Sequence, residues 1–234
     1  MFITFEGGEG TGKSTQVKLL AERLREHGRD VYTTREPGGT ADAEALRSLL
    51  VSGEPSRWTS EEELLLVTVG RSSHLRNSIR PRLEQNIDVI CDRFVDSTYV
   101  YQCFAGSAKF ELFRDVSAAI MGESWPQLTI VLDLDPMIGI PRSRNRMANL
   151  KIASEVAVTE GIQTNSMELI DAAGTLSAAA SEDRFERKQF DFHQKVRAGF
   201  IEITKRNPDR CKLVDANRPI GVVADDIWKL VNFD

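Results

Sequence analysis

Two hydrophobic periods alternate along this chain. Five short apolar runs are typical of β-strands, and they cover residues 1–5, 30–34, 88–91, 128–134 and 212–214. The segments between them carry apolar residues every three to four positions, which predicts helices. The first helix is expected directly after the first strand and its glycine-rich loop, and to end at His27–Gly28. The other helices are expected over residues 41–51, 60–80, 96–104, 110–121, 137–146, 183–206 and 219–231. Strands that alternate with helices predict an α/β fold, a doubly wound parallel sheet with helices on both faces.

Residues 147–182 depart from this pattern. They are rich in Ala, Ser and Thr, contain no aromatic residue and show no sustained helical period. We interpret them as an insertion, mobile at least in part, within one domain that spans residues 1–234.

Two local signals refine the helix expected over residues 60–80. Ser60 followed by Glu63 has the spacing of a capping box, which predicts the start of the helix. Pro81 is expected to kink the helix rather than to end it.

A glycine-rich stretch lies between the first strand and the first helix. It fits the pattern G-x-x-x-x-G-K-[ST] in the strand–loop–helix context of a phosphate-binding loop. Glycine allows backbone N–H groups to close around a polyphosphate, and the helix N-terminus adds partial positive charge. Lys13 is expected to reach the β- and γ-phosphates, and the Ser14 hydroxyl to ligate Mg²⁺. The predicted nucleotide-binding residues are Gly7, Gly8, Glu9, Gly10, Thr11, Gly12, Lys13, Ser14 and Thr15.

Charge and composition narrow the class of protein. The formal net charge is −5, which argues against a general nucleic-acid or membrane-surface binder, because such binding needs basic surface. The three cysteines lack metal-ligand spacing and indicate free thiols in a reducing cytoplasm. No apolar run approaches the length of a membrane span. The first residues already form a core strand, which leaves no room for a signal peptide. A cytoplasmic protein is therefore expected.

Two further charged pairs follow predicted strands. Arg35–Glu36 comes after the second strand and Asp92–Arg93 after the third. Ligands in doubly wound folds bind at the carboxyl ends of strands, so both pairs are expected beside the phosphate loop. Arg93 suits bidentate binding of an acceptor phosphate. Asp92 either holds Mg²⁺ through water or caps the next helix, and Arg35 and Glu36 either meet the nucleotide or pair with each other.

Together with other stretches, these motifs resemble the thymidylate kinase family, which transfers the γ-phosphoryl group of ATP to dTMP. The matching stretches are residues 5–16, 35–40, 91–98, 101–102, 133–136, 183–186 and 191–193, with Arg142, Arg144 and Arg146. The Asp-Arg-Phe block at residues 92–94 is more specific than the phosphate loop, which many families share. The resemblance implies a P-loop nucleoside-monophosphate-kinase-like fold, ATP and Mg²⁺ as cofactors, dTMP as the small-molecule substrate, and a homodimer.

The resemblance also implies residue roles. Lys13, Arg93 and Arg184 are expected to be catalytic. The residues expected to bind the acceptor nucleotide are Glu9, Glu36, Arg47, Val67, Arg71, Arg93, Thr98, Tyr101 and Gln102. Thr98 and Gln102 would hydrogen-bond the thymine edge, and Tyr101 would fill the space that a 2′-hydroxyl needs. These roles have structural alternatives: an outward-facing loop residue for Glu9, a surface ion pair for Arg93 and a solvated helix face for Arg47 and Arg71. For Thr98, Tyr101 and Gln102 the alternative is ordinary helix packing.

The lid of the family falls on residues 142–186. Gly10 brings no charge into the phosphate loop, as in the bacterial branch of the family, so arginines of the lid must supply it. Arg142 and Arg146 are the expected ATP contacts, and Arg144 is a further candidate. A spacing of two residues splays side chains around a helix, so not all three can face ATP.

The sequence departs from the family pattern at three places. Val67 stands where the family usually has a Phe that stacks on thymine, and Cys103 replaces a common Gly. The lid carries about three dozen residues where a short loop is usual.

Other nucleotide-binding classes fit less well. The chain has no N-K-x-D run, which a GTPase would need, and no S-G-G-Q-like signature of a transporter ATPase. The nearest alternatives are a kinase for another deoxynucleoside monophosphate and a nucleotide-binding protein without turnover. The second is suggested by Val67 and the altered lid.

Overall fold

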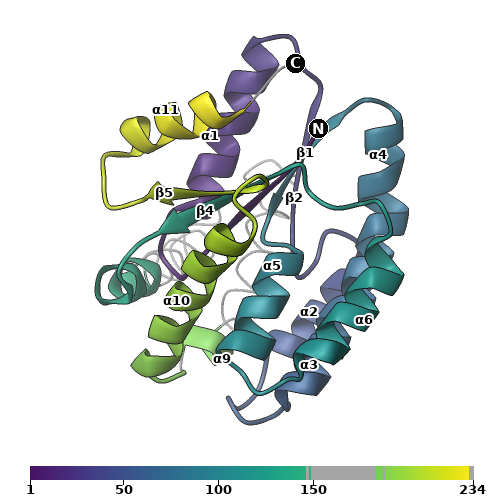
Figure 1. Ribbon diagram of the computed structural model, residues 1–234, viewed down its shortest axis with the longest axis vertical. Helices are drawn as coiled ribbons and strands as arrows, with labels where there is room; N and C mark the ends of the chain where they lie inside the picture. The colour runs from purple at the N-terminus through teal and green to yellow at the C-terminus, as the bar shows by residue number, and fades with distance from the viewer. Residues whose placement is uncertain (146–147, 149–182, 187, 232–234) are drawn as a thin grey trace, which may run out of the picture.

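A five-stranded parallel sheet forms the centre of the protein (Figure 1). The computed structural model describes residues 1–145, 148, 183–186 and 188–231. The strand order is β2-β3-β1-β4-β5. The strands are β1 (Phe2–Gly7), β2 (Val31–Arg35), β3 (Asp88–Asp92), β4 (Leu128–Asp133) and β5 (Cys211–Asp215). All five predicted strands are confirmed, with small differences at their ends.

Helices cover both faces of the sheet, as predicted. They are α1 (Lys13–Glu26), α2 (Ala41–Val51), α3 (Ser60–His74), α4 (Arg80–Glu84), α5 (Val95–Thr98), α6 (Phe110–Met121), α9 (Asp183–Glu186), α10 (Phe190–Arg206) and α11 (Ile220–Leu230), with two π-helical segments, η1 (Leu75–Ile79) and η2 (Tyr99–Phe104); residues 136–145 are also helical. Figure 1 shows α1 and α11 on one side of the sheet and α5, α6 and α10 on the other. No helix in the described part of the chain is both long and apolar enough to cross a membrane.

Alternating side chains of β1 build a core on each face. Ile3 and Phe5 pack in the cluster that includes α1 and α11. Phe2 points to the other face and packs with Val89 and Cys91 of β3 against η1 and α6. Because both faces are buried, the strand reads as a continuous apolar run, which is why the sequence identified it.

Of the two local predictions about the helix that begins near residue 60, the capping box needs correction, whereas the helix does continue past Pro81. The capping box at the start of α3 is formed by Thr59 and Glu62, one residue before the predicted pair: Thr59 Oγ1 accepts from Glu62 N at 3.2 Å and Thr59 N donates to Glu62 Oε2 at 2.8 Å. Both pairs have the same spacing, so sequence alone did not separate them. The helix expected over residues 60–80 changes to a π-helical pattern over η1 before Pro81, which has no N–H to donate, and continues as α4.

Polar side chains cross one face of the sheet and join its strands. Thr4 of β1 and Thr129 of β4 share a hydrogen bond of 2.8 Å. Arg210 donates to Thr129 Oγ1 at 2.8 Å and to both oxygens of Asp96 at 2.6 and 2.9 Å. Asp96 is 6% exposed, and a buried carboxylate is costly unless a cation pairs with it.

We expect Arg210→Met to lower the free energy of unfolding by about 3 kcal/mol, because the variant leaves the buried Asp96 carboxylate without its counter-ion. Urea titrations of both proteins at pH 7 would measure the loss. Arg114→Met is the matched control, since the ion pair of Arg114 with Asp115 is exposed, and it should leave the midpoint unchanged. Equal midpoints for Arg210→Met and the unmodified protein would contradict the proposed role of this pair.

Candidate active site

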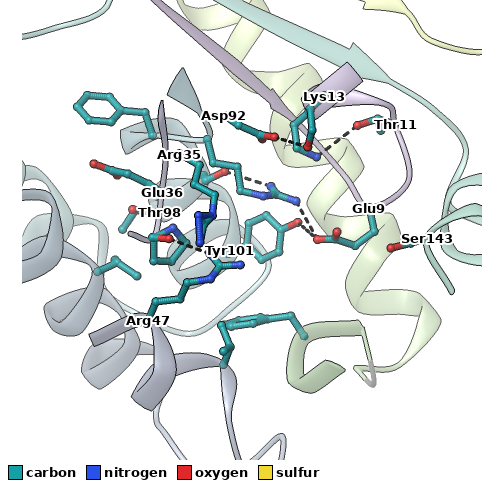
Figure 2. A pocket seen from close by; sticks show the side chains of 18 of the residues that line it. Glu9, Thr11, Lys13, Arg35, Glu36, Arg47, Asp92, Thr98, Tyr101 and Ser143 are labelled. Atoms are coloured by element: carbon teal, nitrogen blue, oxygen red, sulfur yellow. Dashed lines mark hydrogen bonds and ion pairs between the residues drawn. The ribbon is translucent and has the colours of Figure 1, made fainter. Parts of the chain in front are cut away.

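A cavity of about 420 Å³ lies at the carboxyl ends of the central strands (Figure 2). It is lined by the phosphate loop, by the segment after β2, by the Asp92–Thr98 segment and by side chains of α2, α3 and η2. The lining residues that the sequence had singled out are Glu9, Gly10, Thr11, Gly12, Lys13, Ser14, Thr15, Arg35, Glu36, Arg47, Val67, Arg71, Asp92, Arg93, Thr98, Tyr101, Gln102 and Arg142. The rule that ligands bind at strand ends correctly placed the phosphate loop, Arg35–Glu36 and Asp92–Arg93 at one cavity. The other residues in this list were predicted from the family resemblance.

The backbone of the phosphate loop requires its glycines. Gly7, Gly10 and Gly12 have φ angles of 137°, 68° and 88°, a region that other residues rarely adopt. A Cβ atom on Gly10 would collide with the backbone oxygen of Gly139, in the helix over residues 136–145. The loop and this helix are therefore in contact, and a side chain at position 10 would force them apart.

Lys13 curls back over the loop, where its ammonium group faces the cavity (Figure 2). Its Nζ donates to the backbone oxygens of Gly7 and Gly8 at 3.2 and 2.8 Å. Burial and the neighbouring Arg93 lower the pKa of this ammonium group to about 8. An incoming phosphate would replace the carbonyl partners with a full negative charge, which favours the protonated form.

Ser14 and Asp92 meet beside the loop. Ser14 Oγ donates to Asp92 Oδ2 at 2.7 Å. The alternative that Asp92 caps the next helix is wrong, because the N-cap residue of α5 is Phe94 and no side chain caps it. A hydroxyl and a carboxylate oxygen are ligands that suit Mg²⁺. Among the described residues no group of three or more His, Cys, Asp or Glu side chains could hold a metal, so protein ligands alone would not fill an octahedral shell.

Arg93 projects from a strained turn at the tip of β3. Its φ angle of 67° is unusual for a residue other than glycine. The guanidinium group donates to Gly7 O at 2.9 Å and to Glu9 Oε1 at 2.8 Å. It lies 5.1 Å from the ring centre of Tyr101.

Glu9 faces the cavity rather than outward. Its Oε1 also accepts from the Tyr101 hydroxyl at 3.0 Å (Figure 2). Burial alone would raise the pKa of Glu9, but Arg93 and Lys13 lower it to about 2. Glu9 is thus an ionised acceptor held between two cations.

Glu36 organises the neighbouring wall. It is 6% exposed, and its carboxylate accepts from Arg71 Nε at 2.8 Å and contacts His74 Nδ1 at 3.0 Å. The possible pairing of Arg35 with Glu36 is not observed; Arg35 instead donates to Glu44 at 3.1 Å. Arg71 is buried rather than on a solvated face, and it also donates to Thr98 Oγ1 at 2.9 Å.

The rest of the cavity mixes apolar and polar groups. Arg47 lines the cavity, and its guanidinium group donates to Pro37 O at 2.8 Å (Figure 2). Val67 lines the wall together with Phe94 and Phe185. Phe185 was missed as a lining residue, because its sequence context offered only the lid motif.

The arginines predicted to lie in the lid differ in their positions relative to the cavity. Arg142 lines the cavity. Arg146 and the predicted insertion, apart from residue 148, lie outside the described residues. Arg184 is fully buried and donates to the backbone oxygens of residues 50, 54 and 55 at 3.0–3.1 Å. It does not line the cavity, so the geometry does not support a catalytic role for Arg184; four acceptors, including Glu63 at 2.7 Å, already occupy its guanidinium group.

Sequence reasoning also missed Glu6, the last side chain before the loop. It is completely buried. Its Oε1 accepts from Phe94 N at 2.8 Å and Ser97 N at 3.2 Å, and its Oε2 accepts from Ser97 Oγ at 2.5 Å. Glu6 therefore holds the turn that carries Arg93. An acid at the end of an otherwise apolar strand was the available signal.

Comparisons with known proteins identify the family of this chain. A family model described as thymidylate kinase matches residues 5–181. The chain is 40% identical over 230 residues to a thymidylate kinase of Caulobacter vibrioides, covering 98% of this chain and 95% of the relative. It is 42% identical over 225 residues to a thymidylate kinase of Dinoroseobacter shibae, covering 96% and 93%. A crystal structure of thymidylate kinase from Ehrlichia chaffeensis aligns with a TM-score of 0.70 at 29% identity, covering 99% of this chain and 98% of that chain.

We expect Glu6 to make stability depend on pH. Burial and the charge of Asp96 raise the pKa of Glu6 from 4.5 to about 8. The folded protein thus keeps a proton that the unfolded chain releases above pH 4.5, so this contribution is full below pH 4.5 and is lost as pH rises to 8. Glu6→Gln should remove the slope, which is at most about 1.4 kcal/mol per pH unit. Urea titrations from pH 5 to pH 8 would show the two stability curves converging or crossing; parallel curves would contradict the role of Glu6.

Proposed function

This chain belongs to the thymidylate kinase family, whose members are ATP-dependent nucleoside monophosphate kinases, and we propose that its cavity aligns the γ-phosphate of ATP with the phosphate of dTMP. One observation carries the proposal. Lys13 of the phosphate loop and Arg93 of the β3 tip donate to the same carbonyl oxygen, that of Gly7. Two cations from separate strand ends therefore converge where the transferred phosphoryl group would pass.

In the proposed reaction the protein needs to do little covalent chemistry itself; its task is to position the substrates and to balance their charge. An anionic oxygen of the dTMP phosphate attacks the γ-phosphorus, and the bond to the oxygen bridging the β- and γ-phosphates breaks, which gives dTDP and ADP. The attacking oxygen needs no general base because it already lacks a proton. Lys13 would balance charge on the β- and γ-phosphates, and Arg93 charge on the acceptor phosphate.

Ser14 and Asp92 are the proposed protein contacts of Mg²⁺. Mg²⁺ usually keeps several waters and binds through one or two protein oxygens together with substrate phosphates. The Ser14–Asp92 pair beside the loop fits that arrangement. When bound, the ion neutralises charge on the β- and γ-phosphates.

The wall opposite the loop is the proposed nucleoside site. Tyr101 and Glu9 hold each other beside Arg93, which suits a sugar placed between the phosphate and the base. Tyr101 would exclude a 2′-hydroxyl, and Glu9 would accept from the sugar. Thr98 and Gln102 would meet the base edge, and Arg47, Glu36 and Arg71 would complete the acceptor site.

We propose that residues 142–186 act as the lid and that Arg142 contacts ATP. Its position in the cavity lining supports this assignment. Arg146 stays a prediction, and Arg184 is proposed to anchor the end of the lid rather than to touch phosphate.

A homodimer is the proposed assembly. Exposed apolar side chains gather on two neighbouring helices, Leu65 and Val69 on α3 and Phe110 on α6. Leu65 and Val69 are four residues apart and so share one face of α3, which suits a contact between two subunits.

A cytoplasmic location is also proposed, because the three cysteines are free thiols, which are typical of a reducing compartment.

Lys13→Ala and Arg93→Ala should each lower kcat for dTMP by at least ~100-fold, because each removes charge stabilisation in a water-poor site. A coupled ADP-release assay with dTMP, dUMP, dGMP and dCMP would measure this and also distinguish the alternative substrates. Lys18→Ala and Arg23→Ala are matched controls on α1, where these residues pair with Glu22 and Asp225, and should keep full activity. Near-normal turnover by Lys13→Ala or Arg93→Ala would refute the assigned roles.

Val67→Phe should lower KM for dTMP with little change in KM for ATP. A ring at this position offers the thymine a flat face, and base–aromatic stacking is worth roughly 1–3 kcal/mol. That range corresponds to about 5- to 150-fold in affinity. An unchanged or higher KM for dTMP, with an unchanged melting temperature, would show that the site does not lack an aromatic face; Phe94 or Phe185 would then already supply it.

A further inference from the structure

A buried carboxylate stands one layer behind the proposed base site. Glu63 of α3 is 1% exposed. Its Oε1 lies 2.7 Å from Arg184 and 3.8 Å from Lys188, and its Oε2 accepts from Gln102 Nε2 at 3.0 Å. The capping box of α3 uses Thr59 and Glu62, so Glu63 is not needed to start the helix.

The charge of Glu63 determines which end of the Gln102 amide faces it. A glutamine amide can rotate by 180° and keep almost the same shape, exchanging an acceptor for a donor. A carboxylate paired with a guanidinium group can only accept hydrogen bonds. The NH₂ group of Gln102 must therefore point to Glu63, and the Oε1 atom must point away from it.

Arg184 holds the carboxylate in place. Its guanidinium group is completely buried and donates to the backbone oxygens of Leu50, at the end of α2, and of Glu54 and Pro55, in the connection to α3. A guanidinium group held by backbone oxygens cannot follow a moving partner, so Glu63 is fixed in turn. This chain of contacts links α9 to Gln102.

Gln102 and Thr98 both line the cavity, four residues apart in the chain, and offer it an acceptor and a donor. Gln102 lines the cavity, and its Oε1 accepts no hydrogen bond from the part of the chain that the structure describes. Thr98 lies four residues earlier, and its Oγ1 already accepts from Arg71 at 2.9 Å. The hydroxyl hydrogen of Thr98 is therefore available to a ligand.

We propose that Glu63 is a specificity-determining positioning residue, which orients the Gln102 amide so that its carbonyl selects a pyrimidine with a hydrogen on N3. This inference rests on the proposed function. Thymine and uracil present a C4 carbonyl next to N3–H, an acceptor beside a donor, which complements Thr98 and Gln102. Cytosine presents the reverse order, a C4 amino group beside an unprotonated N3, so two acceptors would face each other in a buried site.

Glu63→Gln tests the proposal. The new amide can donate to Gln102 Oε1, so the Gln102 amide is free to rotate and to accept either order of donor and acceptor. Sites built to hydrogen-bond a substrate N–H can reject its analogue by 10⁴–10⁵-fold. We expect the ratio of kcat/KM for dTMP to that for dCMP to fall at least ~10-fold. The ratio for dTMP to dUMP should stay unchanged, because both bases carry N3–H.

Two further variants keep the test decisive. The double variant Glu63→Gln with Arg184→Met removes the buried guanidinium charge together with the carboxylate and leaves only Lys188, which is 19% exposed, without its acidic partner. It serves if the single variant does not fold, and it should show the same fall. Gln102→Leu removes the proposed reader and should lose the same discrimination. A lower melting temperature with unchanged ratios would mean that Glu63 is merely structural and would overturn the inference.

The same assay separates this inference from the function beneath it. Turnover of dTMP by the unmodified protein, with a dTMP to dCMP ratio that Glu63→Gln leaves unaltered, refutes the role of Glu63 alone. Absence of dTMP turnover by the unmodified protein refutes the proposed function and the inference together.

Discussion

Lys13 and Arg93 donate to one carbonyl oxygen, that of Gly7, at 3.2 and 2.9 Å. Two cations this close repel each other, and burial makes the repulsion stronger. Carboxylates offset it, since the charges of Asp92 and Glu9 favour the protonated form of Lys13. A protein with a net charge of −5 thus concentrates positive charge at one point, where phosphate groups would replace the backbone oxygens as partners.

Buried acidic side chains one layer further back contact the groups that line the cavity. Glu6 accepts from the backbone of the turn that bears Arg93, and Arg210 pairs with the neighbouring Asp96. On the opposite wall, Glu63 accepts a hydrogen bond from Gln102 Nε2. Glu6 and Glu63 do not line the cavity themselves, but each contacts a residue that does, Ser97 and Gln102 respectively. Correct positioning of such residues is what phosphoryl transfer demands of a protein.

Sequence patterns identified the elements whose cause is local. Parallel strands that are covered on both faces are mostly apolar, so the five strands were visible as short apolar runs. The phosphate loop was visible because its backbone needs glycine at positive φ. The Arg93 site followed from the rule that strand ends converge. The same local logic misplaced the α3 capping box by one residue, because Thr59–Glu62 and Ser60–Glu63 share the same spacing.

The sequence by itself determined the family, the α/β order and many, but not all, of the residues that line the cavity. Only the tertiary structure decided which ion pairs and hydrogen bonds the charged side chains form. Ser97 and Glu6 are 91 residues apart, and Arg184 reaches an oxygen 134 residues away. Arg184 was expected at phosphate and is instead buried among backbone oxygens, while Glu6 and Glu63 drew no functional prediction. Periodicity and turn chemistry act over a few residues, whereas the pairing of buried charges depends on which distant segments folding brings together.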